Sequence, residues 1–267
     1  MATRRLAARQ VERVWGRRDL PPAFPGPAGD GEPIGEIWFE GEADAPLLVK
    51  YLFTSERLSI QVHPGDEAAS ARGYRRGKDE AWYVLGAEPG ATIGLGLTRP
   101  VSPDELTAAA RDGSIVDLLD WRPVAAGDVF YSPGGTIHAI GAGLSLIEVQ
   151  QNLDLTYRFY DYGRPRELHL DEALAIADPG PFSAPSPPRE AGPGRIILAE
   201  GRAFRLERWQ GGRHAELPAG SVLIPLAAGG TLDGQPLEDS TIWAADGAVS
   251  VAGAADLLAA IPSEQGA

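Results

Sequence analysis

The chain has 267 residues, a hydrophobic fraction of 43% and a formal net charge of −13, which suffices for one large or two modest globular domains. That negative charge argues against nucleic-acid binding, which needs a basic face, so we expect no nucleic-acid partner. The absence of cysteine excludes disulfides, thiolate metal ligands and cysteine nucleophiles.

In chain order, the first segment is residues 1–15, which contains arginines but no long apolar core. It therefore does not predict a secretory signal, and we expect a short amphipathic helix there. No apolar run approaches the roughly 18 residues of a membrane span, so we expect no membrane association. The lack of cysteine agrees with a reducing compartment, and we expect a cytoplasmic location.

Short segments of alternating apolar and polar residues follow, separated by turns with Gly and Pro, and they predict strands. In residues 58–63 the apolar face would carry Leu58, Ile60 and Val62, and the polar face would carry Ser59, Gln61 and His63. Further strands are predicted over residues 82–85, 128–133, 144–150 and 156–161. This succession is typical of an all-β sandwich or barrel.

Three short helices interrupt the strands. Asp66 is placed to cap a helix that continues to about Arg76. A capping box at residues 102–105 predicts a second helix, and Gly113 supplies its C-terminal stop. A third helix is predicted over residues 170–177.

The composition divides the chain into two parts. Residues 179–194 are so rich in Pro and Gly that they predict a linker. We therefore expect a first domain of residues 1–178 and a smaller C-terminal β-domain of residues 195–267. The C-terminal part has one histidine and no lysine, so we expect it to have a structural role.

Five polar residues of the first domain form a candidate metal site. Gln61 and His63 are two apart on a predicted strand and share a face, as do Lys78 and Glu80, while His138 follows a Gly-rich turn. Polar side chains inside a barrel are costly unless something binds them. Two imidazoles, a carboxylate and an amide oxygen favour Zn²⁺ first and leave Fe²⁺, Mn²⁺ and Co²⁺ open. By spacing alone, solvated strand-edge residues explain the pattern about equally well.

At these residues the sequence resembles the type I mannose-6-phosphate isomerases, a family of cupin-fold enzymes. The resemblance covers most of residues 11–161 and rests on several motifs in the same order. They are VWG (14–16), IGEIW (34–38), LLVKYL (47–52), LSIQVHP (58–64), GKDEAWY (77–83), GTIHAIG (135–141) and EVQQNLDLTYRFYDYGR (148–164). Many metal cupins of other chemistry have a histidine where this chain has Gln61.

The resemblance implies a cupin (jelly-roll) β-barrel, a smaller degenerate second cupin-like domain, and one divalent metal ion per chain, with Zn²⁺ as first choice. It implies metal ligands at Gln61, His63, Glu80 and His138. It also implies catalytic roles for Arg158, Lys78 and Glu148, and we expect substrate contacts from Ser59, Lys78 and Arg158.

The implied activity interconverts mannose 6-phosphate and fructose 6-phosphate by moving a proton between C1 and C2 through an enediol. Glu148 could act as the base, or could orient Arg158 or a ligand histidine. Two other readings remain open: another metal-dependent cupin enzyme, such as a glucose-6-phosphate isomerase or a dioxygenase, and a non-catalytic sugar-phosphate-binding cupin. The sequence leaves the catalytic base, the native metal and the oligomeric state open.

Overall fold

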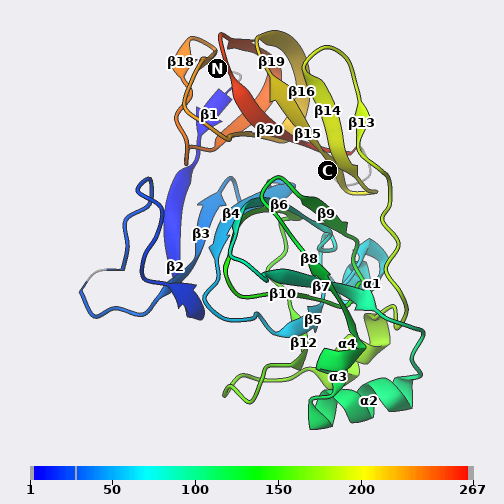
Figure 1. Cartoon of the computed structure of the whole chain (residues 1–267). Coiled ribbons are helices and arrows are strands. Elements are labelled where there is room, and N and C mark those ends of the chain that lie inside the picture. The colour runs from blue at the N-terminus through cyan, green and yellow to red at the C-terminus, as the bar shows by residue number, and fades with distance from the viewer. Residues whose placement is uncertain (1–2, 28, 264–267) are drawn as a thin grey trace.

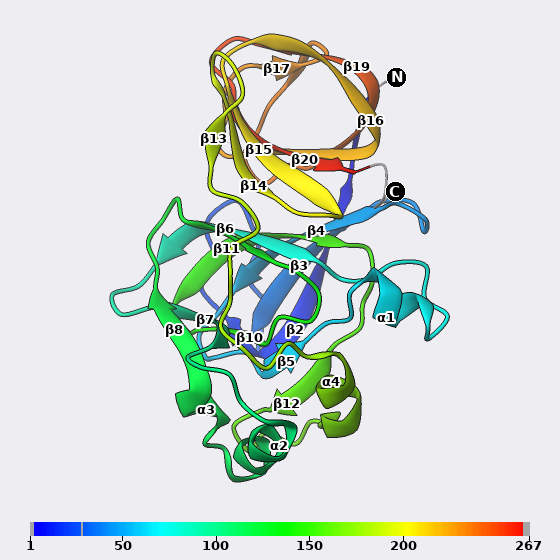
Figure 2. The same cartoon turned by 90° about the vertical axis from the view of Figure 1, so that its right-hand side faces the viewer.

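The computed structural model describes residues 3–27 and 29–263, and the described residues form twenty strands and four short helices (Figure 1). This confirms the expected all-β fold with a few helices. Two units are stacked on one another: a first unit with two sheets and the helices, and a C-terminal unit built on one sheet (Figure 2). Within the described ranges, no helix is long and apolar enough to cross a membrane.

Two antiparallel sheets form the first unit. The six-stranded sheet has, in spatial order, β2 (Ala7–Arg17), β3 (Ile34–Glu40), β4 (Leu47–Phe53), β11 (Leu144–Gln151), β6 (Glu80–Ala87) and β9 (Val129–Ser132). The five-stranded sheet has β12 (Tyr157–Tyr160), β5 (Ile60–Val62), β10 (His138–Ile140), β7 (Thr92–Leu97) and β8 (Leu119–Pro123). Each predicted strand of this unit therefore corresponds to an observed one.

Three of the four helices cover the outer face of the five-stranded sheet, namely α2 (Pro103–Asp112), α3 (Ile115–Leu118) and α4 (Leu170–Ile176). The other helix, α1 (Asp66–Ser70), lies to the side of the sheets (Figure 2). Ile60 and Val62 of β5 pack in one apolar cluster with Leu106 of α2 and Ala173 of α4. Because side chains alternate along a strand, this packing turns Gln61 toward the interior of the unit. Leu58 precedes β5 and packs in a different cluster, so it does not continue the apolar face as predicted.

Local signals set α2 as predicted. The Ser102 hydroxyl accepts a hydrogen bond from the backbone N–H of Glu105 at 3.2 Å, which satisfies one of the free donors of the first turn. Gly113 closes the helix with φ of 87°, a left-handed conformation that glycine adopts without steric cost.

Helix α1 is shorter than predicted, because it ends at Ser70 rather than near Arg76, and its N-cap is Gly65 rather than Asp66. The Asp66 carboxylate accepts hydrogen bonds from the backbone N–H of Gly77 and from Gln151 Nε2 instead. The Asp66 side chain, which the sequence predicts as the helix cap, therefore bonds to residues distant in the sequence instead.

The C-terminal unit consists of one nine-stranded sheet that curls around an apolar core (Figure 2). Its strands are β13 (Arg189–Glu190), β14 (Arg195–Glu200), β15 (Phe204–Gln210), β20 (Asp256–Pro262), β16 (Arg213–Pro225), β19 (Trp243–Ala252), β17 (Thr231–Leu232), β18 (Gln235–Pro236) and β1 (Thr3–Arg5). Residues 179–194 contain β13 as their one regular element among the described residues.

The N-terminal helix is a wrong prediction. Residues 3–5 form β1, which pairs with β19 of the C-terminal sheet, and residues 7–17 form β2, which pairs with β3. The free edges of these two sheets supply partners far along the chain, and such pairing overrides a weak local helix preference.

The two units share an apolar core. Tyr51 and Phe53 of β4 lie in one buried cluster with Phe204, Leu206 and Ile224 of the C-terminal sheet. The six-stranded sheet is therefore covered by the C-terminal unit on this face, and its other face is turned toward the five-stranded sheet.

Candidate metal centre and active site

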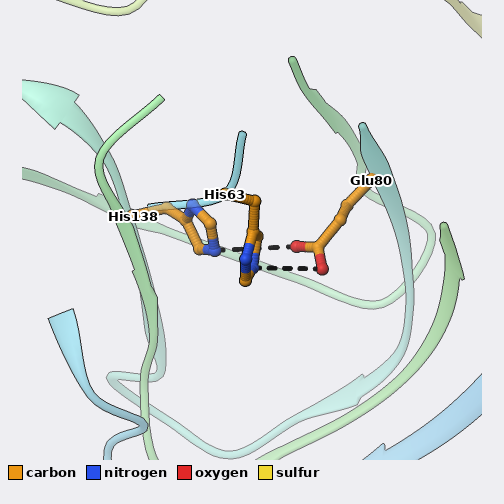
Figure 3. A group of neighbouring side chains, drawn as sticks. All are labelled: His63, Glu80 and His138. Atoms are coloured by element: carbon orange, nitrogen blue, oxygen red, sulfur yellow. Dashed lines mark ion pairs between the residues drawn. The ribbon is translucent and has the colours of Figure 1, made fainter. Parts of the chain in front are cut away.

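Three strands bring two histidines and a glutamate together between the sheets of the first unit. His138 of β10 lies opposite Gln61 of β5 in the register, His63 directly follows β5, and Glu80 begins β6 of the other sheet. All three residues are 2% exposed or less, and one potential donor atom from each lies within 4.8 Å of the other two (Figure 3).

Backbone carbonyls orient both imidazoles. His63 Nδ1 lies 2.8 Å from the Leu155 carbonyl and His138 Nδ1 lies 2.9 Å from the Thr136 carbonyl, so Nδ1–H is the donor in each ring. Burial lowers the pKa of His138, and burial together with the Lys78 charge lowers the pKa of His63 well below its ordinary value. Both rings are therefore neutral, and each turns the lone pair of Nε2 toward Glu80.

The Glu80 carboxylate is ionised although it is buried. Lys78 Nζ lies 2.9 Å from Glu80 Oε1 and 3.3 Å from His63 Nε2. Burial raises the pKa of Glu80, but the positive charges nearby, that of Lys78 first and that of Lys50 with it, outweigh burial, so the net pKa is lowered. Two imidazole nitrogens and one carboxylate oxygen that face a common point are a donor set suited to a divalent ion.

Gln61 lies beside the two histidines. Its Nε2 is 3.3 Å from Nε2 of both His63 and His138, and its Oε1 accepts a hydrogen bond from the Ser59 hydroxyl at 2.9 Å. A half-turn of the amide would exchange oxygen and nitrogen, and the Ser59 hydroxyl could then accept instead of donate. The residue is thus placed next to the donor set with its nitrogen, rather than its oxygen, facing it.

A cavity between the two sheets gathers the sequence-predicted residues. Its lining includes Ser59, Gln61, Lys78, Glu80, Glu148 and Arg158. His63 and His138 lie behind it in contact with Gln61, so the structure brings all the candidate residues into one neighbourhood.

Arg158 presents an unsatisfied cationic group at this cavity. Its Nε is buried and has no hydrogen-bond partner among the described residues. Burial and the neighbouring charge of Arg166 lower the pKa of Arg158, yet a guanidinium stays protonated in proteins. A guanidinium whose buried Nε–H has no acceptor suits an anionic ligand, which would supply the missing acceptor.

The regular alternation of side chains along β12 is interrupted. A register shift between Arg158 and Tyr160 indicates a β-bulge, which moves Tyr160 off the face that Thr156 and Arg158 present to the cavity. Tyr160 packs instead against the cluster beneath the helices.

Glu148 has partners other than those expected. Its Oε1 lies 3.3 Å from Lys50 Nζ and its Oε2 accepts a hydrogen bond from Trp82 Nε1 at 3.1 Å. Burial lowers the pKa of Lys50, but the charges of Glu148 and Glu36 outweigh it and raise the pKa. The carboxylate is therefore oriented by Lys50 and Trp82, rather than orienting Arg158 or a histidine itself.

Sequence reasoning missed several residues that line the same cavity: Arg13, Trp15, Glu36, Lys50, Asp154 and Arg166. Lys50 could have been found most readily from the sequence. It is one of two lysines in the chain, and it lies in a strand that is buried along its whole length. Trp15, Glu36 and Asp154 lie within the family motifs, which therefore offered a signal for them, whereas Arg13 and Arg166 lie outside those motifs.

Comparison with known proteins finds several relatives that are all named as mannose-6-phosphate isomerases. The chain is 35% identical over 217 residues to the mannose-6-phosphate isomerase of Streptococcus mutans, a match covering 74% of this chain and 68% of that protein. It is 32% identical over 234 residues to the probable mannose-6-phosphate isomerase GmuF of Bacillus subtilis, covering 82% of this chain and 69% of that one. The match to ManA of Bacillus subtilis is 41% identical but spans 51% of that protein.

Solved structures agree. The Bacillus subtilis mannose 6-phosphate isomerase superposes with a TM-score of 0.83 at 26% identity, covering 97% of this chain and 99% of that one. A putative mannosephosphate isomerase from Archaeoglobus fulgidus, at a TM-score of 0.73 and 20% identity, shares the fold. These likenesses confirm the predicted cupin-type barrel. No family model matches the sequence, but by the extent and identity of its relatives the chain belongs to the mannose-6-phosphate isomerase family.

Proposed function

We propose that this chain is an aldose–ketose isomerase that interconverts mannose 6-phosphate and fructose 6-phosphate and holds one divalent metal ion. The observation that carries the proposal is the buried group of His63, Glu80 and His138 beside an unpartnered Arg158. Family membership supplies the substrate class, because the relatives are named as isomerases of mannose 6-phosphate.

The metal ligands in this proposal are His63, Glu80 and His138, with Gln61 as a fourth ligand once its amide has turned. Zn²⁺ is our first choice, since the donors are nitrogen and oxygen without thiolate and since four such ligands suit zinc. A bound divalent ion supplies electrostatic stabilisation for negative charge that develops on a substrate oxygen.

The remaining residues bind the substrate and move its proton. Arg158 offers a planar fork of donors to the phosphate or to developing oxyanion charge. Ser59 and Lys78 line the cavity within reach of a bound sugar, and Lys78 and Glu148 are the candidate proton carriers between C1 and C2. The cavity lies between two sheets, which limits water around the reacting carbons.

We assign this chemistry to residues 1–178, with 179–194 as linker and 195–267 as a supporting β-domain. We place the activity in the cytoplasm, where a chain without cysteine needs no oxidative folding. The expected partner is a small sugar phosphate, with no nucleic acid or membrane.

The test is an assay of fructose 6-phosphate formed from mannose 6-phosphate, with the metal content of the same sample measured by mass spectrometry. We expect turnover, about one Zn²⁺ per chain, and loss of both after chelation. His63→Ala and Glu80→Gln should lose metal and activity. His214→Ala is the matched control, because His214 is an exposed histidine of the C-terminal sheet.

Other outcomes would replace the proposal. Preferential turnover of glucose 6-phosphate would indicate that the protein is an isomerase of that sugar phosphate instead. Oxygen uptake with a small organic substrate would indicate a dioxygenase. Sugar-phosphate binding without turnover would indicate a non-catalytic cupin. Full activity in His63→Ala would contradict the site itself.

A further inference from the structure

Asp79 lies between two residues of the candidate site but faces away from it. Lys78 and Glu80 line the cavity, and strand alternation directs the intervening side chain to the opposite side. The buried Asp79 carboxylate accepts a hydrogen bond from the Tyr131 hydroxyl at 2.9 Å and another from the Gly134 backbone N–H at 2.8 Å.

These two bonds connect the segments that carry the metal ligands. Gly134 belongs to the turn that precedes His138, and Gly135 of the same turn donates its backbone N–H to the His63 carbonyl at 2.8 Å. A Cβ on Gly134 would come within 2.4 Å of the Gly65 backbone nitrogen, so the turn rests directly on the segment after His63. One carboxylate thereby joins the strand of Glu80 to the segments of both histidines.

The backbone of Asp79 is held separately. Its N–H donates to Gln151 Oε1 and its carbonyl accepts from the Gln151 N–H, both at 3.0 Å. Glu80 also remains paired with Ser132 and Gln150 in the sheet. Removing the Asp79 side chain therefore leaves the strand anchored and releases the turn and the Tyr131 hydroxyl.

Tyr131 contacts both Asp79 and the C-terminal unit. Its ring centroid lies 5.0 Å from that of Phe204. Gly201 approaches so closely that a Cβ there would fall 2.1 Å from Tyr131 Cζ. The hydroxyl that holds Asp79 is thus on a ring whose position is set by the C-terminal sheet.

A buried carboxylate costs free energy unless a cation compensates it. Within the described residues, Asp79 makes no ion pair, and its partners are a phenol and a backbone amide. This arrangement orders the ligand segments by hydrogen bonds of fixed direction, which an apolar side chain in the same place would not do.

We propose that Asp79 is a positioning residue for the metal centre, and that Tyr131 makes this positioning depend on the C-terminal unit. The inference rests on the proposed metal site. It gives the C-terminal β-domain a role in the chemistry, since its contact with Tyr131 determines where Asp79 holds the turn before His138.

The experiment measures Zn²⁺ affinity by competition with a chromophoric chelator and the visible absorption of the Co²⁺-substituted protein. We expect Asp79→Ala to bind Zn²⁺ about 10- to 100-fold more weakly, as for loss of partners that orient metal ligands, with altered Co²⁺ bands. Asp79→Asn should recover most of the affinity, because its amide oxygen can still accept from Gly134. Tyr131→Phe, which removes one hydroxyl, should shift affinity in the same direction by a smaller factor.

Thr241→Val is the control for general destabilisation. Thr241 is a buried residue of the C-terminal unit whose hydroxyl donates to the Glu238 carbonyl, and its loss should lower the melting temperature without changing Zn²⁺ affinity. Wild-type affinity and Co²⁺ bands in both Asp79→Ala and Tyr131→Phe would overturn the inference, as would an equal loss of affinity in Thr241→Val. If Asp79→Ala does not fold, Tyr131→Phe decides alone. A wild-type chain that binds no Zn²⁺ would overturn the proposed metal site as well.

Discussion

At the scale of the residue, the candidate site combines charged groups that have an interaction partner with one group that has none. Lys50, Lys78 and Glu148 each face an opposite charge within 3.3 Å, whereas Arg158 has a buried Nε with no partner among the described residues. An unpaired buried donor is costly, so its persistence indicates a group kept free for a ligand.

Arg158 is therefore the residue whose change should affect catalysis most selectively. We expect Arg158→Gln to lower kcat/KM by about 10²–10³-fold, the loss typical of one donor that stabilises developing negative charge, with Zn²⁺ content unchanged. Arg158→Lys should recover only part, because an ammonium lacks the planar fork. Steady-state kinetics and metal analysis on the same samples test this, and an unaltered kcat/KM in Arg158→Gln would contradict the assignment.

At the scale of the element, α2 is a support outside the site. It packs through Leu106, Ala109 and Ala110 on the face of the five-stranded sheet that lies opposite the cavity. Its N-terminus depends on one local hydrogen bond, that from the Glu105 N–H to Ser102.

Ser102→Ala should lower the free energy of unfolding by about 1 kcal/mol, and Ser102→Gly by only a few tenths, the usual ranking at an N-cap. We expect kcat and KM to stay at wild-type values in both, because the helix does not contact the cavity. Urea denaturation followed by circular dichroism measures the stability. Equal stability of the alanine variant and the wild type would show that the cap contributes nothing here.

A second element-scale feature is the charge cluster on β15. Glu207 is fully buried and accepts hydrogen bonds from Arg195, Arg205 and Trp209. Burial raises the pKa of Glu207, but these three donors outweigh it and lower the net pKa below the ordinary glutamate value.

The pH dependence follows from that sign. Because the folded-state pKa is below the unfolded one, Glu207 contributes stability that is fully present above the unfolded pKa and is lost as the pH falls through the folded pKa. Glu207→Gln should destabilise the protein at pH 7 by about 1–3 kcal/mol, and the difference from wild type should shrink toward acid pH. Urea melts across pH 3 to 7 test this; a difference that is constant over that range would contradict it.

At the scale of the whole molecule, the candidate metal centre lies between the two sheets of the first unit. His138 is in the five-stranded sheet, His63 directly follows strand β5 of that sheet, and Glu80 is in the six-stranded sheet. An ion held by all three residues binds the folded chain and not the unfolded one, so it stabilises the fold by mass action.

Zn²⁺ at 100 times its dissociation constant should add about 2.7 kcal/mol to the free energy of unfolding. Thermal denaturation should show a melting temperature that rises with Zn²⁺ and returns to the starting value with a chelator. His63→Ala should show no such rise. A Zn²⁺-dependent shift in that variant equal to the wild-type shift would locate the ion elsewhere.

Features that depend on local spacing could be predicted from the sequence. Ser102 and Gly113 delimit α2 because caps act within one turn. Alternation in β5 turns Ile60 outward and Gln61 inward, because the side-chain period of a strand is two. The ordered motifs indicated the family, and relatives at 32–41% identity bear that out.

Features that depend on partners far along the chain could be seen only in the folded structure. Residues 3–17 became strands because two sheet edges were free to pair with them. Lys50 meets Glu148 because β4 and β11 are neighbours in the sheet. Asp79 meets Tyr131 because β6 pairs with β9. The contacts of Asp79 with Tyr131 and of Lys50 with Glu148 join positions 52 and 98 residues apart in the sequence. No local pattern encodes which strands become neighbours.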